Sequence, residues 1–187
     1  SNVAGLYASQ GAEHAWALLL ALTRQIPLAV HNKDRRAWEG RDVIELAGST
    51  LGLIGLGGFG IEMAKRSQGY NMKILAIDPV RTEKPDYVTE LKPTSPATLH
   101  DLLRRSDVVM TACPLTKETY HLIGAAELAA MKPSAYLINV TRGGIIDEPA
   151  LVEALQNGQI AGAALDVTEK EPLAAESPLW DAPNLVI

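Results

Sequence analysis

Apolar residues fall along this chain in short runs separated by glycine, proline and charged residues. Six runs are typical of buried strands, and they begin near residues 50, 73, 108, 136, 162 and 185. Segments with apolar residues three or four apart lie between most of them, as in amphipathic helices. Strands that alternate with helices predict an α/β fold with a doubly wound parallel sheet and right-handed crossovers. We expect about six strands in the order 3-2-1-4-5-6, with a ligand across their carboxyl ends.

The longest apolar run, Ala15–Leu22, lies in a helix predicted over Gly11–Ile26 and ended by Pro27. The run has no polar face, so the helix is expected to be buried on more than one side. It could lie under the sheet, or between the sheet and another domain or subunit. We favour the second placement, because the helix precedes the first strand and has no strand of its own to cover. The charged stretch 31–47 is expected to be a solvated loop anchored by Trp38.

Local signals mark the other elements. Asp147 is the expected N-cap of a helix, with Pro149 in its first turn and Gly158 beyond its end. The proline-rich stretch 79–96 is expected to be a connection. The other helices are expected at 61–68, 98–105 and 125–131.

The most informative stretch runs from the first strand into Gly55-x-Gly57-x-x-Gly60, then through a helix to a second strand that ends on Asp78. Gly55 permits a tight turn, Gly57 lets a pyrophosphate approach the backbone, and Gly60 lets the helix pack close to the sheet. The helix N-terminus offers N–H groups to phosphates. Asp78, about 20 residues after the glycines, is placed to accept a hydrogen bond from a ribose 2′-OH. The unit predicts a Rossmann dinucleotide site. A nucleoside-binding relative such as a methyltransferase is the alternative.

Composition narrows the function classes. The 187 residues suffice for one domain of ample size, and 47% of them are hydrophobic. A net charge of −5 argues against a nucleic acid or an anionic membrane as partner. Cys113 is the single cysteine and the start of the chain shows no signal-peptide pattern, so we expect a cytoplasmic protein. No metal site is expected.

Three polar stretches follow predicted strands, at the expected ligand edge. They read Pro-Leu-Thr-x-x-Thr from Pro114, Asn-Val-x-Arg-Gly-Gly from Asn139, and Asp-Val-x-Glu-x-Glu-Pro from Asp166. With the glycine motif, and in this order and spacing, they resemble the D-isomer-specific 2-hydroxyacid dehydrogenases. The resemblance extends from about Asn2 to Ile187.

The resemblance implies roles for individual residues. Arg142 would bind the substrate carboxylate and keto oxygen, which suits the planar fork of a guanidinium. Glu171 would orient a histidine acid/base and raise its pKa, and Asp166 would hold the nicotinamide carboxamide. The residues implied to line the cofactor are Gly55, Gly57, Gly58, Phe59, Gly60, Asp78, Cys113, Pro114, Thr119, Val140, Thr141, Arg142 and Asp166.

Plainer interpretations of these residues stay open. Arg142 could be a surface cation, although the adjacent glycines favour a close approach to a ligand. Glu171 could be a solvated loop residue, with Glu169 as a neighbouring candidate for its role, and Asp166 could cap a turn.

The sequence departs from the family pattern in two places. Many relatives have a histidine where Cys113 stands; the position mostly presents backbone to the cofactor, so we expect a small effect. The family's Pro-His pair follows the last strand, and its histidine is expected just beyond Ile187. The four histidines present are read as structural or solvated, namely His14, His31, His100 and His121.

These features predict a domain organisation and a function. Residues 1–187 are expected to be the NAD-binding domain, with 1–30 as a lead-in and interface helix, 49–187 as the Rossmann core, and the substrate domain absent. The implied reaction is hydride transfer between NAD(H) and a D-2-hydroxy or 2-keto acid such as glyoxylate, hydroxypyruvate or phosphoglycerate. The alternatives are a co-repressor-like module that senses NAD and the NAD domain of adenosylhomocysteine hydrolase. A homodimer through Ala15–Leu22 is expected.

Overall fold

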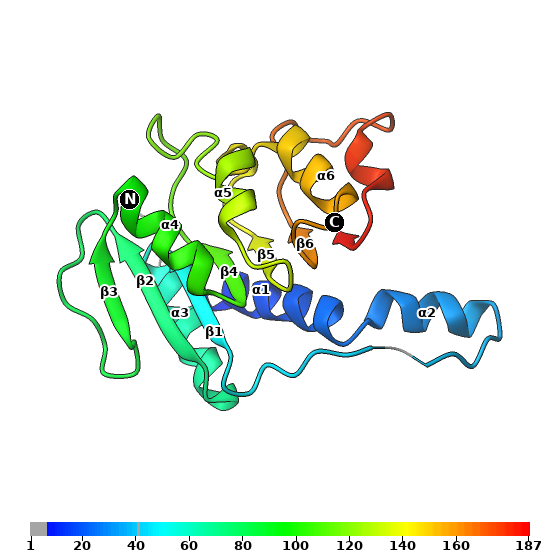
Figure 1. Cartoon of the computed structure of the whole chain (residues 1–187), viewed down its shortest axis with the longest axis horizontal. Helices are drawn as coiled ribbons and strands as arrows, with labels where there is room; N and C mark the ends of the chain where they lie inside the picture. The colour runs from blue at the N-terminus through cyan, green and yellow to red at the C-terminus, as the bar shows by residue number, and fades with distance from the viewer. Residues whose placement is uncertain (1–6, 41) are drawn as a thin grey trace.

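The computed structural model describes residues 7–40 and 42–187 and contains a seven-stranded parallel sheet with helices on both faces (Figure 1). The strand order is β3-β2-β1-β4-β5-β6-β7, which confirms the predicted fold class and extends the predicted order by one strand. Residues 1–6, at the start of the predicted lead-in segment, and Arg41 lie outside the described residues. The strands are β1 Thr50–Ile54, β2 Lys73–Asp78, β3 Glu90–Pro93, β4 Val108–Thr111, β5 Tyr136–Asn139, β6 Gly162–Leu165 and β7 Leu185–Val186.

Helices connect most of these strands. The α-helices are α1 Ala8–Thr23, α2 Ile26–Asp34, α3 Gly58–Ser67, α4 Pro96–Arg105, α5 Ala125–Ala130 and α6 Glu148–Gln156. Short 3₁₀ turns span Gln68–Tyr70 (η2), Gly143–Ile145 (η3) and Pro178–Asp181 (η4). The Asp147 carboxylate accepts a hydrogen bond from Ala150 N–H at 3.2 Å, so the predicted N-cap of α6 is confirmed. None of the described helices is long and apolar enough to cross a membrane.

The core has two halves, one on each face of the sheet. Leu51 and Leu53 of β1 point into the half formed with α1 and α3. Ile54 points into the half formed with α4, α5 and α6. This alternation along a strand buried on both faces explains why β1 reads as a continuous apolar run.

Strand β3 corrects the interpretation of 79–96 as a connection only. It pairs in parallel with β2 at the edge of the sheet, and its residues are half-buried or exposed. An edge strand of this kind has no apolar run, so the sequence pattern did not reveal it. As a result β3, and not the strand at 108, lies beside β2.

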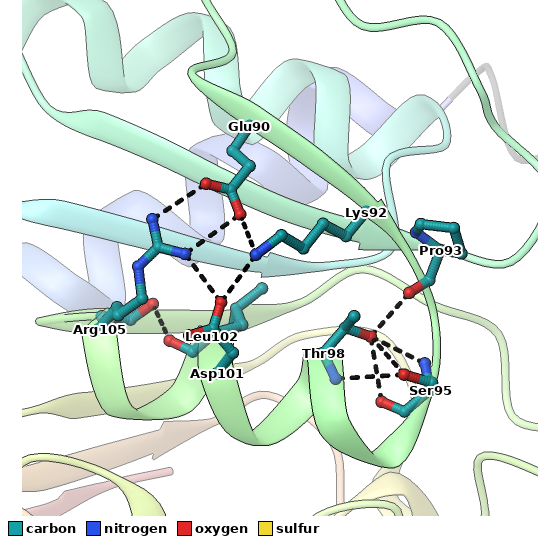
Figure 2. Close-up of polar contacts among 9 residues, drawn as sticks. Glu90, Lys92, Pro93, Ser95, Thr98, Asp101, Leu102 and Arg105 are labelled. Carbon is teal, nitrogen blue, oxygen red and sulfur yellow. Dashed lines mark hydrogen bonds and ion pairs between the residues drawn. The ribbon is translucent and has the colours of Figure 1, made fainter.

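Ion pairs fasten this edge strand to α4 (Figure 2). Glu90 lies 3.0 Å from the Arg105 guanidinium and also contacts Lys92. Asp101 lies 2.8 Å from Arg105 and 3.0 Å from Lys92. A hydrogen bond from Arg105, and to a smaller extent one from Lys92, lowers the pKa of Glu90 to about 2. Charged side chains thus stabilise the position of β3, which has little apolar surface to bury against the core.

The first helix ends earlier than predicted. Helix α1 stops at Thr23, and Gln25 adopts a left-handed conformation with φ of 55° before α2 begins. Pro27 lies in the first turn of α2, where its missing N–H costs nothing, so it begins a helix and does not end one. The expected loop is therefore helical up to Asp34. Trp38 is fully exposed and does not anchor that stretch.

Helix α1 lies on the sheet and against α3. Ala12, Ala15 and Leu19 are fully buried, and the indole N–H of Trp16 donates to the Met63 carbonyl at 3.1 Å. The apolar run is therefore explained mainly by contacts within this chain. The outer side of α1 keeps Ala17 exposed, with Leu20 and Ala21 half-buried. This outer side remains available to another domain or subunit.

Candidate functional site

The three glycines of the motif after β1 meet three different surroundings. Gly55 has φ of 102°, and a Cβ there would lie 2.8 Å from the Ala112 backbone. A Cβ on Gly60 would lie 2.3 Å from the Gly55 carbonyl oxygen, so α3 packs against the turn as expected. A Cβ on Gly57 would meet nothing within 4 Å. Gly55 and Gly60 are therefore required by the fold, whereas Gly57 borders open space.

Helix α3 begins directly at this open space. Its first turn contains Gly58 and Phe59, and the N–H groups of a first helical turn have no partner within the helix. The Phe59 ring packs against Gly11 of α1, where a Cβ would lie 2.2 Å from the ring. This end of α3 combines N–H donors with the positive end of the helix dipole, which suits a phosphate group.

Asp78 stands beside the glycine turn, at the end of β2. Its Oδ2 accepts a hydrogen bond from Leu56 N–H at 2.8 Å, and its Oδ1 accepts from Val80 and Arg81 N–H at 2.9 and 2.8 Å. Burial acts to raise the pKa of Asp78, but the N–H groups of Arg81, Leu56 and Val80 outweigh it and lower the pKa below its ordinary value. Asp78 and Gly57 line one open depression of about 420 Å³. The predicted carboxylate therefore faces the predicted phosphate cradle, and it is ionised.

The loop after β4 contains three predicted residues. Cys113 is buried, and this burial raises the pKa of its thiol to about 11. The Thr119 hydroxyl donates to the Pro114 carbonyl at 2.7 Å and accepts from Thr116 N–H at 2.7 Å. Thr119 thus closes the loop on itself, and Pro114 is exposed on the same loop.

A buried polar cluster holds the loop after β5. Asn139 is fully buried; its Oδ1 accepts from the Thr111 hydroxyl at 2.7 Å and from Thr141 N–H at 3.1 Å. Its amide group donates to the Arg142 carbonyl at 2.8 Å. Val140 and Thr141 are buried, while Arg142 is exposed and its guanidinium donates to the Thr141 carbonyl at 2.6 Å. Asn139 therefore fixes the backbone from which Arg142 extends, a role that the sequence analysis did not assign.

Gly143 brings the β5 loop into contact with the β6 loop. A Cβ on Gly143 would lie 2.0 Å from the carbonyl carbon and oxygen of Thr168. Thr168 N–H donates to Glu171 Oε1 at 3.1 Å, which orients the exposed Glu171 carboxylate. Glu169, the neighbouring candidate, instead accepts from the Tyr120 hydroxyl. The structure thus puts Arg142 and Glu171 on two loops that touch at Gly143.

Two histidines that were read as structural or solvated contact carboxylates at this edge, His14 from helix α1 and His121 from the loop after β4. His14 Nε2 lies 3.0 Å from Asp166 Oδ1, although 151 residues separate them in the sequence. His121 stacks on Tyr120, with ring centroids 3.9 Å apart, and its Nε2 lies 3.4 Å from the Glu169 carboxylate. No local sequence pattern signals either contact, because each joins segments that only the fold brings together.

The opposite edge of the sheet has its own depression, of about 340 Å³, beside Ser49 and Tyr136. Asp107 there accepts from Lys132 Nζ at 2.7 Å and from Thr50 N–H at 2.8 Å. This carboxylate is already occupied in holding the sheet together. Within the described residues no group of three or more His, Cys, Asp or Glu side chains could hold a metal ion.

All the predicted residues follow the carboxyl ends of strands β1, β2, β4, β5 and β6. Asp78 and Asp166 stand four strands apart in the sheet order, which corresponds to roughly 20 Å. The N–H groups in the first turn of α3, with Asp78 near one end of the site and Asp166 near the other, fit an extended dinucleotide with its pyrophosphate at Gly57.

Comparison with known proteins agrees with this geometry. Residues 16–187 match the family model described as D-isomer specific 2-hydroxyacid dehydrogenase, NAD binding domain. The chain is 39% identical to a glyoxylate reductase of Thermococcus gammatolerans, covering 100% of this chain and 58% of the relative. It is 43% identical to a D-3-phosphoglycerate dehydrogenase of Archaeoglobus fulgidus, covering 94% of this chain and 33% of the relative. The chain therefore spans between a third and three fifths of the length of these curated relatives.

Solved structures are similar too. An NAD-dependent formate dehydrogenase from Staphylococcus aureus in complex with NAD superposes with a TM-score of 0.85 at 31% identity, covering 95% of this chain and 54% of that chain. A D-isomer specific 2-hydroxyacid dehydrogenase from Xanthobacter autotrophicus in complex with NADPH gives a TM-score of 0.83 at 33% identity, covering 96% of this chain and 73% of that chain.

Proposed function

The chain belongs to the D-isomer-specific 2-hydroxyacid dehydrogenase family, whose NAD-binding domain it matches over residues 16–187, and from this we propose that it binds NAD(H) for hydride transfer between that cofactor and a D-2-hydroxy or 2-keto acid. The observation that carries the proposal is the open cradle at Gly57, which lies beside the ionised Asp78 and at the N-terminus of α3. The two relatives named above, a glyoxylate reductase and a phosphoglycerate dehydrogenase, support small 2-keto or 2-hydroxy acids as the substrate class.

We infer a preference for NAD(H) over NADP(H). The lowered pKa of Asp78 keeps a negative charge where a 2′-phosphate would have to sit, whereas a free 2′-OH can donate to it. Arg81 lines the same depression, but its guanidinium donates to the Glu83 carbonyl at 3.4 Å. Titration calorimetry should give tighter binding for NADH than for NADPH, and Asp78→Ala should narrow the difference. Tighter NADPH binding by the unaltered chain would refute this preference.

The residues around the β5 and β6 loops suit the chemistry. Bound NAD(H) supplies or accepts the hydride. Arg142, extended from backbone that Asn139 holds, presents two N–H groups to the carboxylate and keto oxygen of the substrate. Glu171, oriented by Thr168 N–H, is placed to hold a histidine acid/base in its protonated form.

Two glycine variants test the cofactor proposal. A Cβ on Gly57 or on Gly69 would meet nothing within 4 Å, so both Gly57→Ala and Gly69→Ala should fold normally. Only Gly57 lies in the proposed cradle, and a methyl group there should weaken NADH binding about tenfold or more by pushing the pyrophosphate away from the backbone. Equal NADH affinity in the two variants, measured by NADH fluorescence, would exclude Gly57 as the cradle.

We also propose a homodimer in which an arm takes part. The arm consists of α2 with residues 35–40 and 42–45, and it projects from the body of the domain (Figure 1). Ile26, Leu28 and Val30 are exposed along it, away from the core of their own chain. Exposed apolar side chains on a projecting helix favour contact with a second copy, together with the outer side of α1.

Sedimentation at micromolar concentration tests the dimer. The double variant Leu28→Asp with Val30→Asp should be monomeric, whereas Val80→Asp, at an even more exposed apolar residue two positions after β2, should leave the dimer intact. Leu19 is fully buried in its own chain, so an aspartate there would unfold the domain and test nothing about association. A monomeric unaltered chain would refute the proposal. We also propose a cytoplasmic location, because a single cysteine cannot form a disulfide within the chain and so gives no sign of an oxidising compartment.

A further inference from the structure

Helix α1 is tied firmly to the glycine-loop helix α3. Arg66 of α3 donates to the Ser9 hydroxyl at 2.8 Å and lies 3.1 Å from the Glu13 carboxylate. Trp16 stacks on Tyr70, with ring centroids 5.2 Å apart. With the Gly11–Phe59 contact, these bonds fix the first half of α1 relative to the proposed pyrophosphate cradle.

From this fixed helix, His14 reaches the far end of the site. Its Nε2 lies 3.0 Å from Asp166 Oδ1, and Asp166 directly follows β6, where its N–H donates to the Asn139 carbonyl at 3.0 Å. Both side chains are about half-exposed, at 48% and 50%. An exposed carboxylate at a strand end is free to rotate unless something holds it. Among the described residues, His14 is the side chain that holds Asp166.

The geometry points to His14 as a positioning residue for the nicotinamide end of the cofactor. A donor on His14 Nε2 fixes Oδ1 of Asp166 and leaves Oδ2 to accept a hydrogen bond from a primary amide such as the nicotinamide carboxamide. The inference rests on the proposed function and extends it, because it makes α1 part of the nucleotide site at both ends. Gly11 supports the phosphate end through Phe59, and His14 supports the nicotinamide end through Asp166.

Ligands that differ at one end separate this role from a general effect on the fold. ADP-ribose shares the adenosine and pyrophosphate of NADH but lacks the nicotinamide. His14→Leu should therefore weaken NADH binding about tenfold, the equivalent of losing one hydrogen bond to a charged group, and leave ADP-ribose binding within about twofold. His14→Gln retains an N–H donor at similar reach and should restore most of the NADH affinity. His100→Leu removes a histidine that also lies 3.0 Å from a carboxylate, that of Glu127, but joins α4 to α5, and it should change neither affinity.

A double variant tests whether His14 acts through Asp166. Once Asp166→Ala has been made, adding His14→Leu should cost no further NADH affinity, because the alanine leaves His14 no side-chain acceptor at this position. Equal weakening of NADH and ADP-ribose by His14→Leu, no weakening of either, or additive losses in the double variant would each overturn the inference. If the unaltered chain binds ADP-ribose as tightly as NADH, the role of Asp166 fails as well. If it binds neither ligand, the proposed function itself fails.

Discussion

Replacing Gly143 by alanine should loosen the contact between the loops that present Arg142 and Glu171. The new Cβ would lie 2.0 Å from the Thr168 carbonyl group and 2.4 Å from Glu169 N, and both neighbours are backbone. Ordinary contact begins at 3.4 Å, so the β6 loop must retreat by about 1.4 Å. Overpacking of this kind lowers the free energy of unfolding by about 1–3 kcal/mol. Alanine also reduces the conformational entropy of the unfolded chain, which offsets about 0.4–1 kcal/mol of that loss.

The net loss of unfolding free energy for Gly143→Ala is therefore about 1–2 kcal/mol. For a chain of this length, that lowers the melting temperature by roughly 2–8 °C. Gly144→Ala is the matched control. Its Cβ would lie 3.3 Å from the half-exposed Tyr120 ring, only about 0.1 Å inside ordinary contact, so stability should change by no more than about 0.5 kcal/mol.

Urea unfolding followed by circular dichroism measures both variants against the unaltered chain. Because Thr168 N–H holds the Glu171 carboxylate, the same displacement should misplace Glu171 relative to Arg142. Equal stability of Gly143→Ala and Gly144→Ala would refute the reasoning, since it would mean that the β6 loop yields without cost and that the close approach at Gly143 fixes nothing.

Three further predictions concern other residues. Cys113 should resist thiol reagents at pH 8 in the folded chain and react rapidly in guanidinium, because burial raises the pKa of its thiol to about 11; fast labelling of the folded chain would contradict this. Glu90 has a lowered pKa, so its contribution is complete above about pH 4.5 and is lost as the pH falls towards 2; Glu90→Gln should cost about 1 kcal/mol or less at pH 7 after solvent screening and almost nothing at pH 2. An equal cost at both pH values would exclude a charge effect. The 187-residue chain should bind NADH but not oxidise it with glyoxylate, because His14, His100 and His121 lie against Asp166, Glu127 and Glu169 and not against Glu171, and His31 lies on the arm. Turnover that Arg142→Ala abolishes would show that one of these histidines supplies the proton.

The sequence by itself determined most of the sheet, the glycine turn and the N-cap of α6. Strands such as β1 are buried on both faces and are therefore apolar along most of their length, which makes them visible as runs. Gly55 and Gly60 lie so close to other backbone atoms that neither position has room for a side chain. Asp147 caps its helix through a hydrogen bond to a residue only three positions further along the chain. Each of these signals is local, so the order of residues alone contains it.

Tertiary structure decided the rest. Strand β3 forms because β2 offers an unpaired edge and Arg105 of α4 binds Glu90, and both β2 and Arg105 lie outside the strand's own pattern. The chain turns at Gln25 and not at Pro27, because Pro27 is tolerated in the first turn of α2. His14 meets Asp166, and Asn139 meets Thr111, only when α1 and three strands have packed side by side. These contacts join residues far apart in the sequence, and hydrophobic periodicity contains no information about such pairs.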